Sequence, residues 1–283
     1  MSIEQRVVAD ALTVLERHYP PAWAQEWDRV GLVLGEPSAP LRRVLLVVDC
    51  VPATVAQAAA LDVQLIVAHH PLLLRGVSSV APTTYQGRIV HELIRAGIAL
   101  YTAHTNADTA NPGVSDALAQ RLGLVDLRPL RPADGAAAGE GRGPGRVGRL
   151  PAPLSLTELT TMVAGALPAT AWGVRASGDP QRLVETMAVC GGSGDSFLAD
   201  ARSAGVDAYL TADLRHHVAS DTVAGDGPAL LDAAHWATER PWLDHAAGLL
   251  RDDLGVETIA SDIDTDPWTL HAASPRLPLL EYR

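Results

Sequence analysis

The stretch VQLIVAHHPLLLRG, residues 63–76, decides how the chain is expected to fold. Apolar side chains fill nearly every position up to the first histidine, which is typical of a strand buried on both faces of a sheet. Pro71 then ends the strand directly after His69 and His70. The two histidines therefore need not point to opposite faces, and two adjacent imidazoles can each bind one ion of a two-metal site.

Similar apolar runs occur on both sides of this stretch. We expect further buried strands at 44–50 and 98–105, with helices at 52–61 and 87–97 in the intervals between the strands. Strands separated by helices of this length are typical of right-handed crossovers, which place parallel strands in one sheet. The first half of the chain is therefore predicted to be an α/β unit.

The alternation of strand and helix resumes in the second half. The expected elements are strands at 183–194, 206–213, 229–235 and 256–261 and helices at 197–205 and 236–253. Pro241 is an obstacle within the early turns of the last helix, because proline lacks the N–H group that a helix interior needs. The whole chain is predicted to form two α/β domains with mostly parallel or mixed sheets.

A stretch dense in Gly, Pro and Ala separates the two halves. Residues 131–153 sustain neither the helix period nor the strand period, so we interpret them as a linker or a mobile surface loop. The chain is accordingly divided into a first domain at 1–130, this linker, and a second α/β segment at 154–283. The part from about residue 235 is free to pack back on the first domain.

Composition excludes several classes of function. The chain has 283 residues and a formal net charge of -11, so it lacks the clustered positive charge that coats nucleic acid or an anionic membrane. All 22 basic residues are arginine. Without lysine, a Walker A phosphate loop, Schiff-base catalysis and a lysine general base are excluded.

The cysteines and the apolar stretches of the chain indicate the cellular compartment to expect. Cys50 and Cys190 each end an apolar run without paired spacing, so a disulfide framework or a thiolate zinc site is not expected. No apolar stretch reaches the length of a membrane span, and no export signal is visible at the start of the chain. We therefore expect a cytoplasmic protein that does not bind membranes.

Polar side chains gather where the predicted strands end. In open α/β sheets, ligands bind outside the carboxyl ends of the strands. Residues of metal-binding type follow four of these ends, and they are His69, His70, His104, Asp108, Asp213, His216, His217, His235 and Glu239. His235 and Glu239 are four positions apart at a helix start, so they lie on one face and can reach one ion together.

Each of these signals has an ordinary explanation when it stands alone. A pair of adjacent histidines is common as surface or interface polarity, and a histidine four residues before a glutamate is usually a solvated pair. Their coincidence at separate strand ends, without cysteines that would indicate structural zinc, favours a metal site. His216 and His217 remain open to a simpler role at an interface.

Seven segments together resemble a known family. They are EWDRVGLVLG (26–35), AHHPLLLRG (68–76), AHTNAD (103–108), GRVGRL (145–150), AVCGGSG (188–194), YLTADLRHH (209–217) and DAAHWATE (232–239). In order and spacing they are similar to the motifs of the GTP cyclohydrolase I type 2 family, also called NIF-three-like dinuclear-metal hexameric proteins. The resemblance runs nearly end to end and implies a NIF-three-like fold and a toroidal homohexamer.

The resemblance also implies a ligand set for two adjacent divalent metals, with zinc, iron, manganese and nickel as the candidate ions. Carried over position by position, His70 and Asp108 hold one metal and His69 and His235 hold the other. Glu239 then bridges both. These five positions match the family pattern without change.

Two positions depart from the family pattern. Arg29 stands where the family usually has asparagine, and Ala212 stands where it usually has glycine. Some relatives also carry a long inserted domain between the halves, roughly where this chain has its Gly-rich stretch. Because the five metal positions are intact, the departures concern substrate contacts near Arg29 and leave the expected metal site unchanged.

Two adjacent metals are typical of hydrolysis, because they polarise a substrate oxygen and lower the pKa of water. If the family's activity applies, the reaction opens the imidazole ring of GTP. His104 and Asp213 are then candidate proton shuttles, although His104 is equally suited to orient Asp108. Arg75 is a candidate contact for the triphosphate. The alternative is a non-catalytic ring that binds or delivers metal or regulates a partner.

Overall fold

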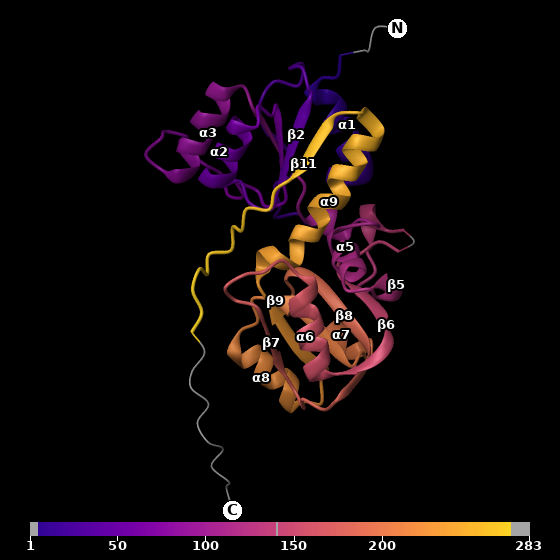
Figure 1. The fold of residues 1–283 in the computed structure, drawn as a ribbon. Helices are drawn as coiled ribbons and strands as arrows, with labels where there is room; N and C mark the ends of the chain where they lie inside the picture. Colours follow the sequence, from indigo (N-terminus) through magenta and orange to yellow (C-terminus); the bar gives the residue numbers. More distant parts are fainter. Residues whose placement is uncertain (1–4, 140, 273–283) are drawn as a thin grey trace, which may run out of the picture.

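Two β-sheets organise the computed structural model, which describes residues 5–139 and 141–272 (Figure 1). The first sheet has five strands in the order β1 (Gly31–Leu34), β4 (Ala99–Thr102), β3 (Leu65–Ala68), β2 (Arg43–Val47) and β11 (Glu257–Ala260). The second has six strands in the order β5 (Val125–Pro129), β6 (Arg146–Ser155), β8 (Leu183–Ser193), β9 (Ala208–Ala212), β10 (Ala229–Ala233) and β7 (Val174–Ser177). The expected α/β class with two sheets is confirmed.

The first sheet is parallel except at its edge strand β1. Strands β2, β3 and β4 are almost entirely buried, as their continuous apolar runs predict. The register pairs Val47 with Ala68 and Ala68 with Thr102, so all three strands end at the same level. The residues that follow these strands therefore lie along the same edge of the sheet.

Helices connect the strands of the first sheet, and of those before β5, helix α5 (Val114–Arg121) packs against α9 (His235–Leu254) and strand β8 of the second sheet. The described part of this region contains α1 (Val8–His18), a 3-10 turn (Pro21–Trp23), α2 (Pro52–Ala60), α3 (Tyr85–Ala96), α4 (Thr105–Thr109), α5 (Val114–Arg121) and a 3-10 turn (Gly135–Ala137). Helix α3 begins two residues before the predicted start, because the Thr84 side chain accepts a hydrogen bond from the Gly87 N–H and caps the helix.

The second sheet is mixed. Strands β8, β9 and β10 run parallel, and β5, β6 and β7 are antiparallel to their neighbours. Its helices are α6 (Leu156–Ala166), a 3-10 turn (Asp195–Phe197), α7 (Leu198–Ser203) and α8 (His216–Ala224). The carboxyl end of β9 lies beside that of β10, so Asp213 and His235 leave the sheet close together.

Part of the expected linker is a strand. Residues 146–153 lie in β6, which pairs with β8, and β5 at the end of the expected first domain pairs with β6. The prolines of this stretch concealed the strand, because its ladder with β8 is interrupted between Arg149 and Leu154, where Pro151 and Pro153 need no N–H partner. Between β5 and β6, the described residues contain the 3-10 turn Gly135–Ala137 and no longer helix or strand.

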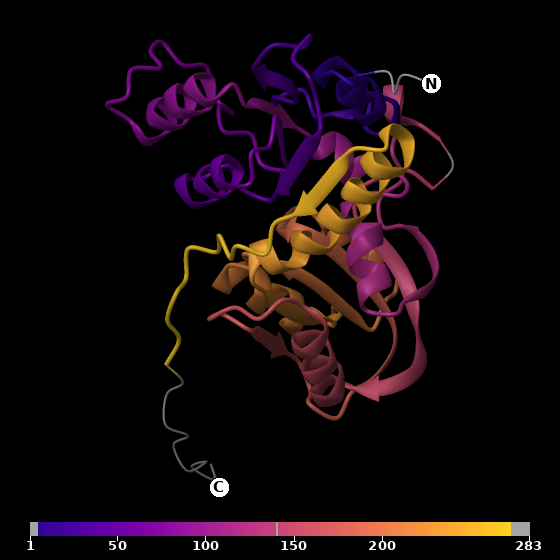
Figure 2. The same cartoon turned by 45° about the horizontal axis from the view of Figure 1, so that its top comes forward.

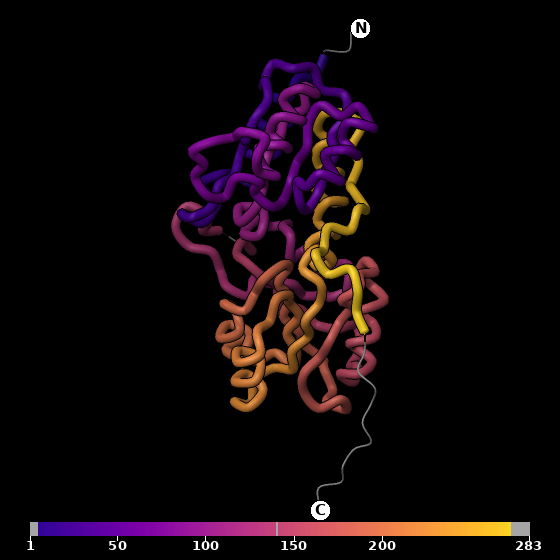
Figure 3. The backbone as a smooth tube through the Cα atoms, turned by 90° about the vertical axis from the view of Figure 1, so that its left-hand side faces the viewer, coloured from indigo at the N-terminus to yellow at the C-terminus, as the bar shows by residue number. Residues whose placement is uncertain are grey.

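Helix α9 (His235–Leu254) connects the two sheets. It packs against α1 and α5, and the strand β11 that follows it pairs in parallel with β2 of the first sheet. Figures 2 and 3 show this part of the chain, in orange and yellow, running from the second sheet to the first. The helix continues through Pro241, because Trp242 and Leu243 directly behind it are fully buried and hold the helix in place.

Two sequence expectations about cysteines and membranes can be compared with the structure. Cys50 and Cys190 are both buried and unpaired, which agrees with the absence of a disulfide framework. Among the helices of residues 5–139 and 141–272, none combines the length and the apolar character that a membrane span needs.

Candidate metal centre

Five predicted ligand positions meet between the two sheets. His69 and His70 follow β3, and Asp108 lies in the short helix α4 behind β4. His235 and Glu239 lie on the first turns of α9, and they approach from the side of the second sheet. The common end level of the parallel strands and the path of α9 together explain why residues 170 positions apart in sequence lie within contact distance.

Glu239 is at the centre of this group and is 3% exposed. Its Oε1 atom lies 3.1 Å from His235 Nε2 and 3.4 Å from His69 Nε2, and its Oε2 atom lies 3.1 Å from His70 Nε2. Asp108 Oδ1 is 3.7 Å from His69 Nε2. One carboxylate therefore faces three imidazoles, with a second carboxylate beside them.

A glycine makes the space for the Glu239 carboxylate. Gly192 on β8 has a φ of +68°, and a Cβ atom there would lie 2.2 Å from Glu239 Oε1 and 2.9 Å from His235 Nε2. Any other residue at this position would collide with both groups. Gly192, the second glycine of the segment AVCGGSG, therefore leaves room for the Glu239 carboxylate, a role that the sequence alone did not reveal.

The outer nitrogen of each of these three imidazoles is held by a partner. His69 Nδ1 lies 2.9 Å from the Ala103 carbonyl oxygen, and His70 Nδ1 lies 2.8 Å from Asp49 Oδ1. His235 Nδ1 lies 2.7 Å from Asp213 Oδ2. Because each Nδ1 is engaged by an outer partner, each Nε2 points to the group around Glu239, which is the arrangement that orients metal-binding histidines.

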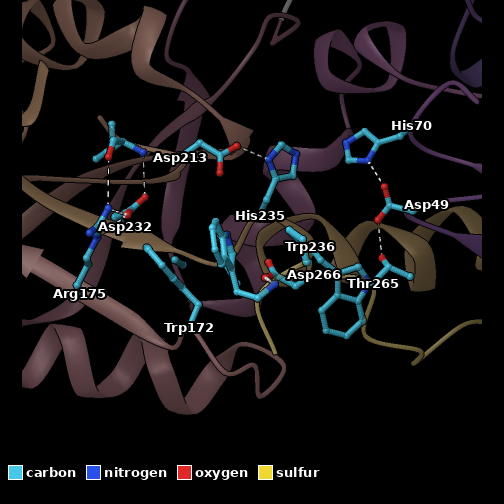
Figure 4. Close-up of a pocket in the computed structure, with 15 residues that line it drawn as sticks. Asp49, His70, Trp172, Arg175, Asp213, Asp232, His235, Trp236, Thr265 and Asp266 are labelled. Atoms are coloured by element: carbon cyan, nitrogen blue, oxygen red, sulfur yellow. Dashed lines mark hydrogen bonds and ion pairs between the residues drawn. The ribbon is translucent and has the colours of Figure 1, made fainter. Parts of the chain in front are cut away.

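Two of these outer partners are carboxylates that follow strands. Asp213, a candidate proton shuttle from the sequence, hydrogen-bonds His235, and its φ of +60° turns the chain directly after β9. Asp49 was missed, although it follows the apolar run of β2 and so satisfies the same strand-end rule as the predicted ligands. Thr265, from the segment after β11, hydrogen-bonds Asp49 in turn (Figure 4).

His104 belongs to the same group. One of its ring nitrogens lies within 4.8 Å of ligand atoms of His69 and His70. Its Nδ1 lies 2.9 Å from Asp28 Oδ1, and Asp28 also accepts hydrogen bonds from the backbone N–H and the hydroxyl of Thr105. The hydrogen bond of His104 is thus made with Asp28, which the sequence missed, and not with Asp108 as one expectation had it.

Burial and mutual contact determine the charges in the centre. Burial raises the pKa of Glu239, but the imidazoles of His235, His70 and His69 outweigh it and hold that pKa well below the usual range. Burial lowers the pKa values of His70 and His235, but the Glu239 carboxylate outweighs it and raises them to about 10 and about 11. Burial raises the pKa of the Asp108 carboxyl.

The side chains present fit a pair of divalent metal ions. Within the described residues, His69 Nε2, His235 Nε2 and Glu239 Oε2 are buried and form no hydrogen bond of regular geometry, although they lie 3.1 to 3.4 Å from the facing ligand atoms. Buried polar atoms normally form such hydrogen bonds, and leaving them unpaired costs free energy. His70, His235 and Glu239 offer ligand atoms that all lie within 4.8 Å of one another. Imidazoles with carboxylates are a donor set suited to zinc, iron, manganese or nickel.

The remaining candidates lie outside this group. His216 and His217 contact each other edge to face at the exposed start of α8, with ring centroids 5.2 Å apart. Arg75 is exposed in the loop after β3. The Arg29 guanidinium hydrogen-bonds the backbone carbonyl of Asp28, so the position that departs from the family pattern lies next to the partner of His104. Ala212 is buried at the end of β9.

Comparison with known proteins identifies the family of this chain. The family model of Duf34/NIF3 (NGG1p interacting factor 3) matches residues 7–267. The chain belongs to the Duf34/NIF3 family. This confirms the family that the seven sequence motifs indicated.

Relatives of this family member are similar over most of their length. A Streptomyces coelicolor protein named GTP cyclohydrolase 1 type 2 homolog is 51% identical over 272 residues, which cover 94% of this chain and 95% of that protein. A Mycobacterium bovis protein of the same name is 37% identical over 368 aligned residues, covering 93% and 97%. The alignment is longer than this chain, so the Mycobacterium relative has additional residues inside the matched region.

Solved structures share the fold. A Bacillus cereus protein related to NIF3 superposes with a TM-score of 0.87 at 24% identity, covering 95% of this chain and all of that one. A Staphylococcus aureus hypothetical protein superposes with a TM-score of 0.86 at 26% identity and the same coverage. The two-sheet architecture is therefore that of the Duf34/NIF3 family.

Proposed function

We propose that this protein binds two divalent metal ions between its two sheets. His69 and His235 hold one ion, His70 and Asp108 hold the other, and Glu239 bridges them. The observation that carries this proposal is the convergence of imidazole nitrogens on one buried carboxylate, with three of these ligand atoms forming no hydrogen bond of regular geometry. The two oxygens of Glu239 support the pairing, because Oε1 faces His69 and His235 while Oε2 faces His70.

We infer further that the protein, when loaded with metal, is a hydrolase of a nucleotide-like substrate. Two adjacent divalent ions supply polarisation of a substrate oxygen and activation of water at neutral pH when they are bound. The protein contributes imidazoles whose orientation is fixed from outside by Ala103, Asp49 and Asp213. Orientation set before the substrate arrives reduces the reorganisation that the reaction requires.

His104 is the residue placed to transfer a proton in this reaction. Asp28 fixes its Nδ1, and a ring nitrogen is presented toward His69 and His70. Trp27 packs edge-on against the His104 ring, with the ring centroids 5.9 Å apart. A fixed imidazole at this distance from the ligands can give or take a proton at Nε2. Asp213 instead positions His235.

The names of the relatives suggest the substrate. Two of them are named GTP cyclohydrolase 1 type 2 homolog, so we propose opening of the imidazole ring of GTP as the first reaction to test. We also propose a homohexameric ring, as the family resemblance implies. Sedimentation at micromolar concentration tests the ring, and a monomer there would contradict it.

Steady-state turnover tests the hydrolase. Purified protein, stripped of metal and reloaded separately with zinc, iron, manganese or nickel, is assayed against nucleoside triphosphates, nucleoside monophosphates and simple phosphoesters. We expect turnover of at least one nucleotide that depends on metal and disappears with a chelator. If fully loaded hexamer leaves every nucleotide intact, a non-catalytic metal-binding or regulatory ring becomes the better interpretation.

A further inference from the structure

A cavity of about 480 Å³ opens beside the metal centre. His70 and His235 line it on the side of the centre, and Trp172, Arg175 and Trp268 line it further away. Figure 4 shows Arg175 and Trp172 at the end opposite to His70. The volume lies in the range of small-molecule sites, so one ligand can contact these residues and the centre together.

Arg175 on β7 is fixed before any ligand binds. Its Nε atom donates to Asp232 Oδ2 at 2.7 Å, and its Nη2 atom donates to the Leu214 carbonyl at 3.3 Å. Its Cζ atom lies 4.7 Å from the centroid of the Trp172 ring. The Nη1 group has no hydrogen-bond partner among the described residues, and the side chain is 60% exposed. A guanidinium held on one edge and one face is suited to bind an anionic group with its free edge.

Two tryptophans form an aromatic platform next to this arginine. Trp172 precedes β7, and Trp268 lies on the segment that follows β11, so they come from distant parts of the sequence. Their ring centroids are 6.0 Å apart with an interplanar angle of 33°. Trp268 is nevertheless 59% exposed. Exposed indole faces on a cavity wall stack well with planar heterocycles.

Asp266 is a further polar residue that lines the cavity. Its side chain accepts a hydrogen bond from the backbone N–H of Trp268, and the residue is 8% exposed. Asp49 and Asp213 are engaged with imidazoles, and Asp232 is engaged with Arg175. Asp266 is thus the lining carboxylate left to accept N–H groups from a ligand ring. The cavity therefore offers one anion contact, one aromatic platform and one acceptor.

We propose that this cavity recognises a phosphorylated nitrogen heterocycle of mononucleotide size. The ring stacks on Trp172 and Trp268, and the phosphate binds Arg175. This inference rests on the proposed function, because it places the reacting part of the ligand against His70 and His235. It names the substrate class through residues that lie outside the metal ligands.

Binding of guanosine 5′-monophosphate, guanosine and inorganic phosphate tests the proposal on the full chain, with and without zinc. Isothermal titration gives Kd, and quenching of tryptophan fluorescence reports stacking. We expect Arg175→Met to weaken the monophosphate on the order of tenfold and to leave guanosine unchanged. Trp268→Ala should weaken both by a similar factor, and Trp172→Phe should weaken them less.

Two matched variants control for general effects. Arg149→Met removes an exposed arginine that pairs with Asp126 away from the cavity, and Tyr85→Ala removes an exposed aromatic side chain on α3. Both should bind the monophosphate as the unchanged protein does. The proposal is overturned if the Arg175 and Trp268 variants keep full affinity for the monophosphate, or if the controls lose as much as they do.

The same variants separate this inference from the proposed function. If the protein holds two ions and turns over a nucleotide while the Arg175 and Trp268 variants bind and react normally, the cavity assignment is wrong and the hydrolase stands. If the protein holds no metal but binds the monophosphate in an Arg175-dependent way, the hydrolase is wrong and the cavity assignment stands.

Discussion

His69 and His235 approach the metal centre from opposite sides and are held in different ways. On the side of the first sheet, His69 has a side chain that is 1% exposed, and its Nδ1 is held by the backbone carbonyl of Ala103. On the side of the second sheet, His235 is 28% exposed, and its Nδ1 is held by Asp213, whose side chain is 54% exposed. The sheet itself fixes the first imidazole, whereas a surface charge fixes the second.

This difference indicates which of the two imidazoles can be loosened by a single side-chain substitution. No side-chain change removes the Ala103 carbonyl, but Asp213 can be replaced without disturbing the core. Glu239 connects the two sides, because one of its oxygens faces imidazoles from both. Variants at these positions therefore separate the contributions of the first sheet, the second sheet and the bridge.

The largest effect on metal content is expected from changes to Glu239, the proposed bridging ligand. Glu239→Ala, and the nearly isosteric Glu239→Gln, should lose both ions, whereas His69→Ala should retain one. Glu92→Gln, an exposed change on α3, serves as control. Metal content after dialysis against buffered zinc measures the outcome. Equal loss of metal from the Glu239 and His69 variants would remove the bridging assignment.

Next in size is the effect on turnover at His104. His104→Ala should reduce turnover by roughly 10²-fold or more if it transfers a proton, while metal content stays close to that of the unchanged protein. Asp28→Asn should act in the same direction, because it withdraws the partner of His104 Nδ1. If both variants lose metal and turnover in parallel, His104 and Asp28 support the structure of the centre instead of transferring a proton.

A smaller effect sharpens the comparison of the two sides. Asp213→Asn and Asp49→Asn should each weaken metal affinity about 10-fold to 100-fold, because such partners orient metal-binding histidines. The Asp213 variant should affect the ion held with His235, and the Asp49 variant the ion held with His70. Asp62→Asn, an exposed aspartate paired with Arg42, is the control. Competition with a chelating dye measures both affinities, and unchanged values would show that the partners do not orient the ligands.

The smallest effect is a pH dependence of the metal-free protein. The pKa values of His70 and His235 are raised above 6.5 in the folded state, to about 10 and about 11. Their protonated forms therefore stabilise the fold fully below pH 6.5, and this stability is lost as pH rises toward 10.

Metal-loaded protein should not show this loss, because its imidazoles carry no proton at the ligand nitrogen. The difference in Tm between loaded and metal-free protein should widen between pH 7 and 10, by about 2 to 4 °C for each kcal/mol lost. Curves that run parallel across this range would contradict the assigned charges.

Much of the fold follows from patterns that the sequence displays openly. The buried strands β2, β3 and β4 are continuous apolar runs, and the residues after them are the ones that meet at the centre. Strand β6 was hidden because Pro151 and Pro153 interrupt its ladder with β8. Composition marks such a stretch as a linker, and only its pairing partner shows otherwise.

The supporting residues of the site were harder to predict than the ligands. Asp28 reaches His104 from 76 positions away, and no periodicity in the intervening sequence brings the two together. Thr265 and Trp268 reach the site because β11 returns to the first sheet. Such contacts depend on how the chain's end crosses from one sheet to the other, which local patterns do not encode.

The number and positions of bound metal ions test the central claim most directly. Protein loaded with zinc is measured by elemental analysis, and its crystals are measured by anomalous diffraction at the zinc edge. The account predicts two ions per chain, both contacting Glu239, one shared with His69 and His235 and the other with His70 and Asp108. A single ion, or ions bound away from Glu239, would contradict it.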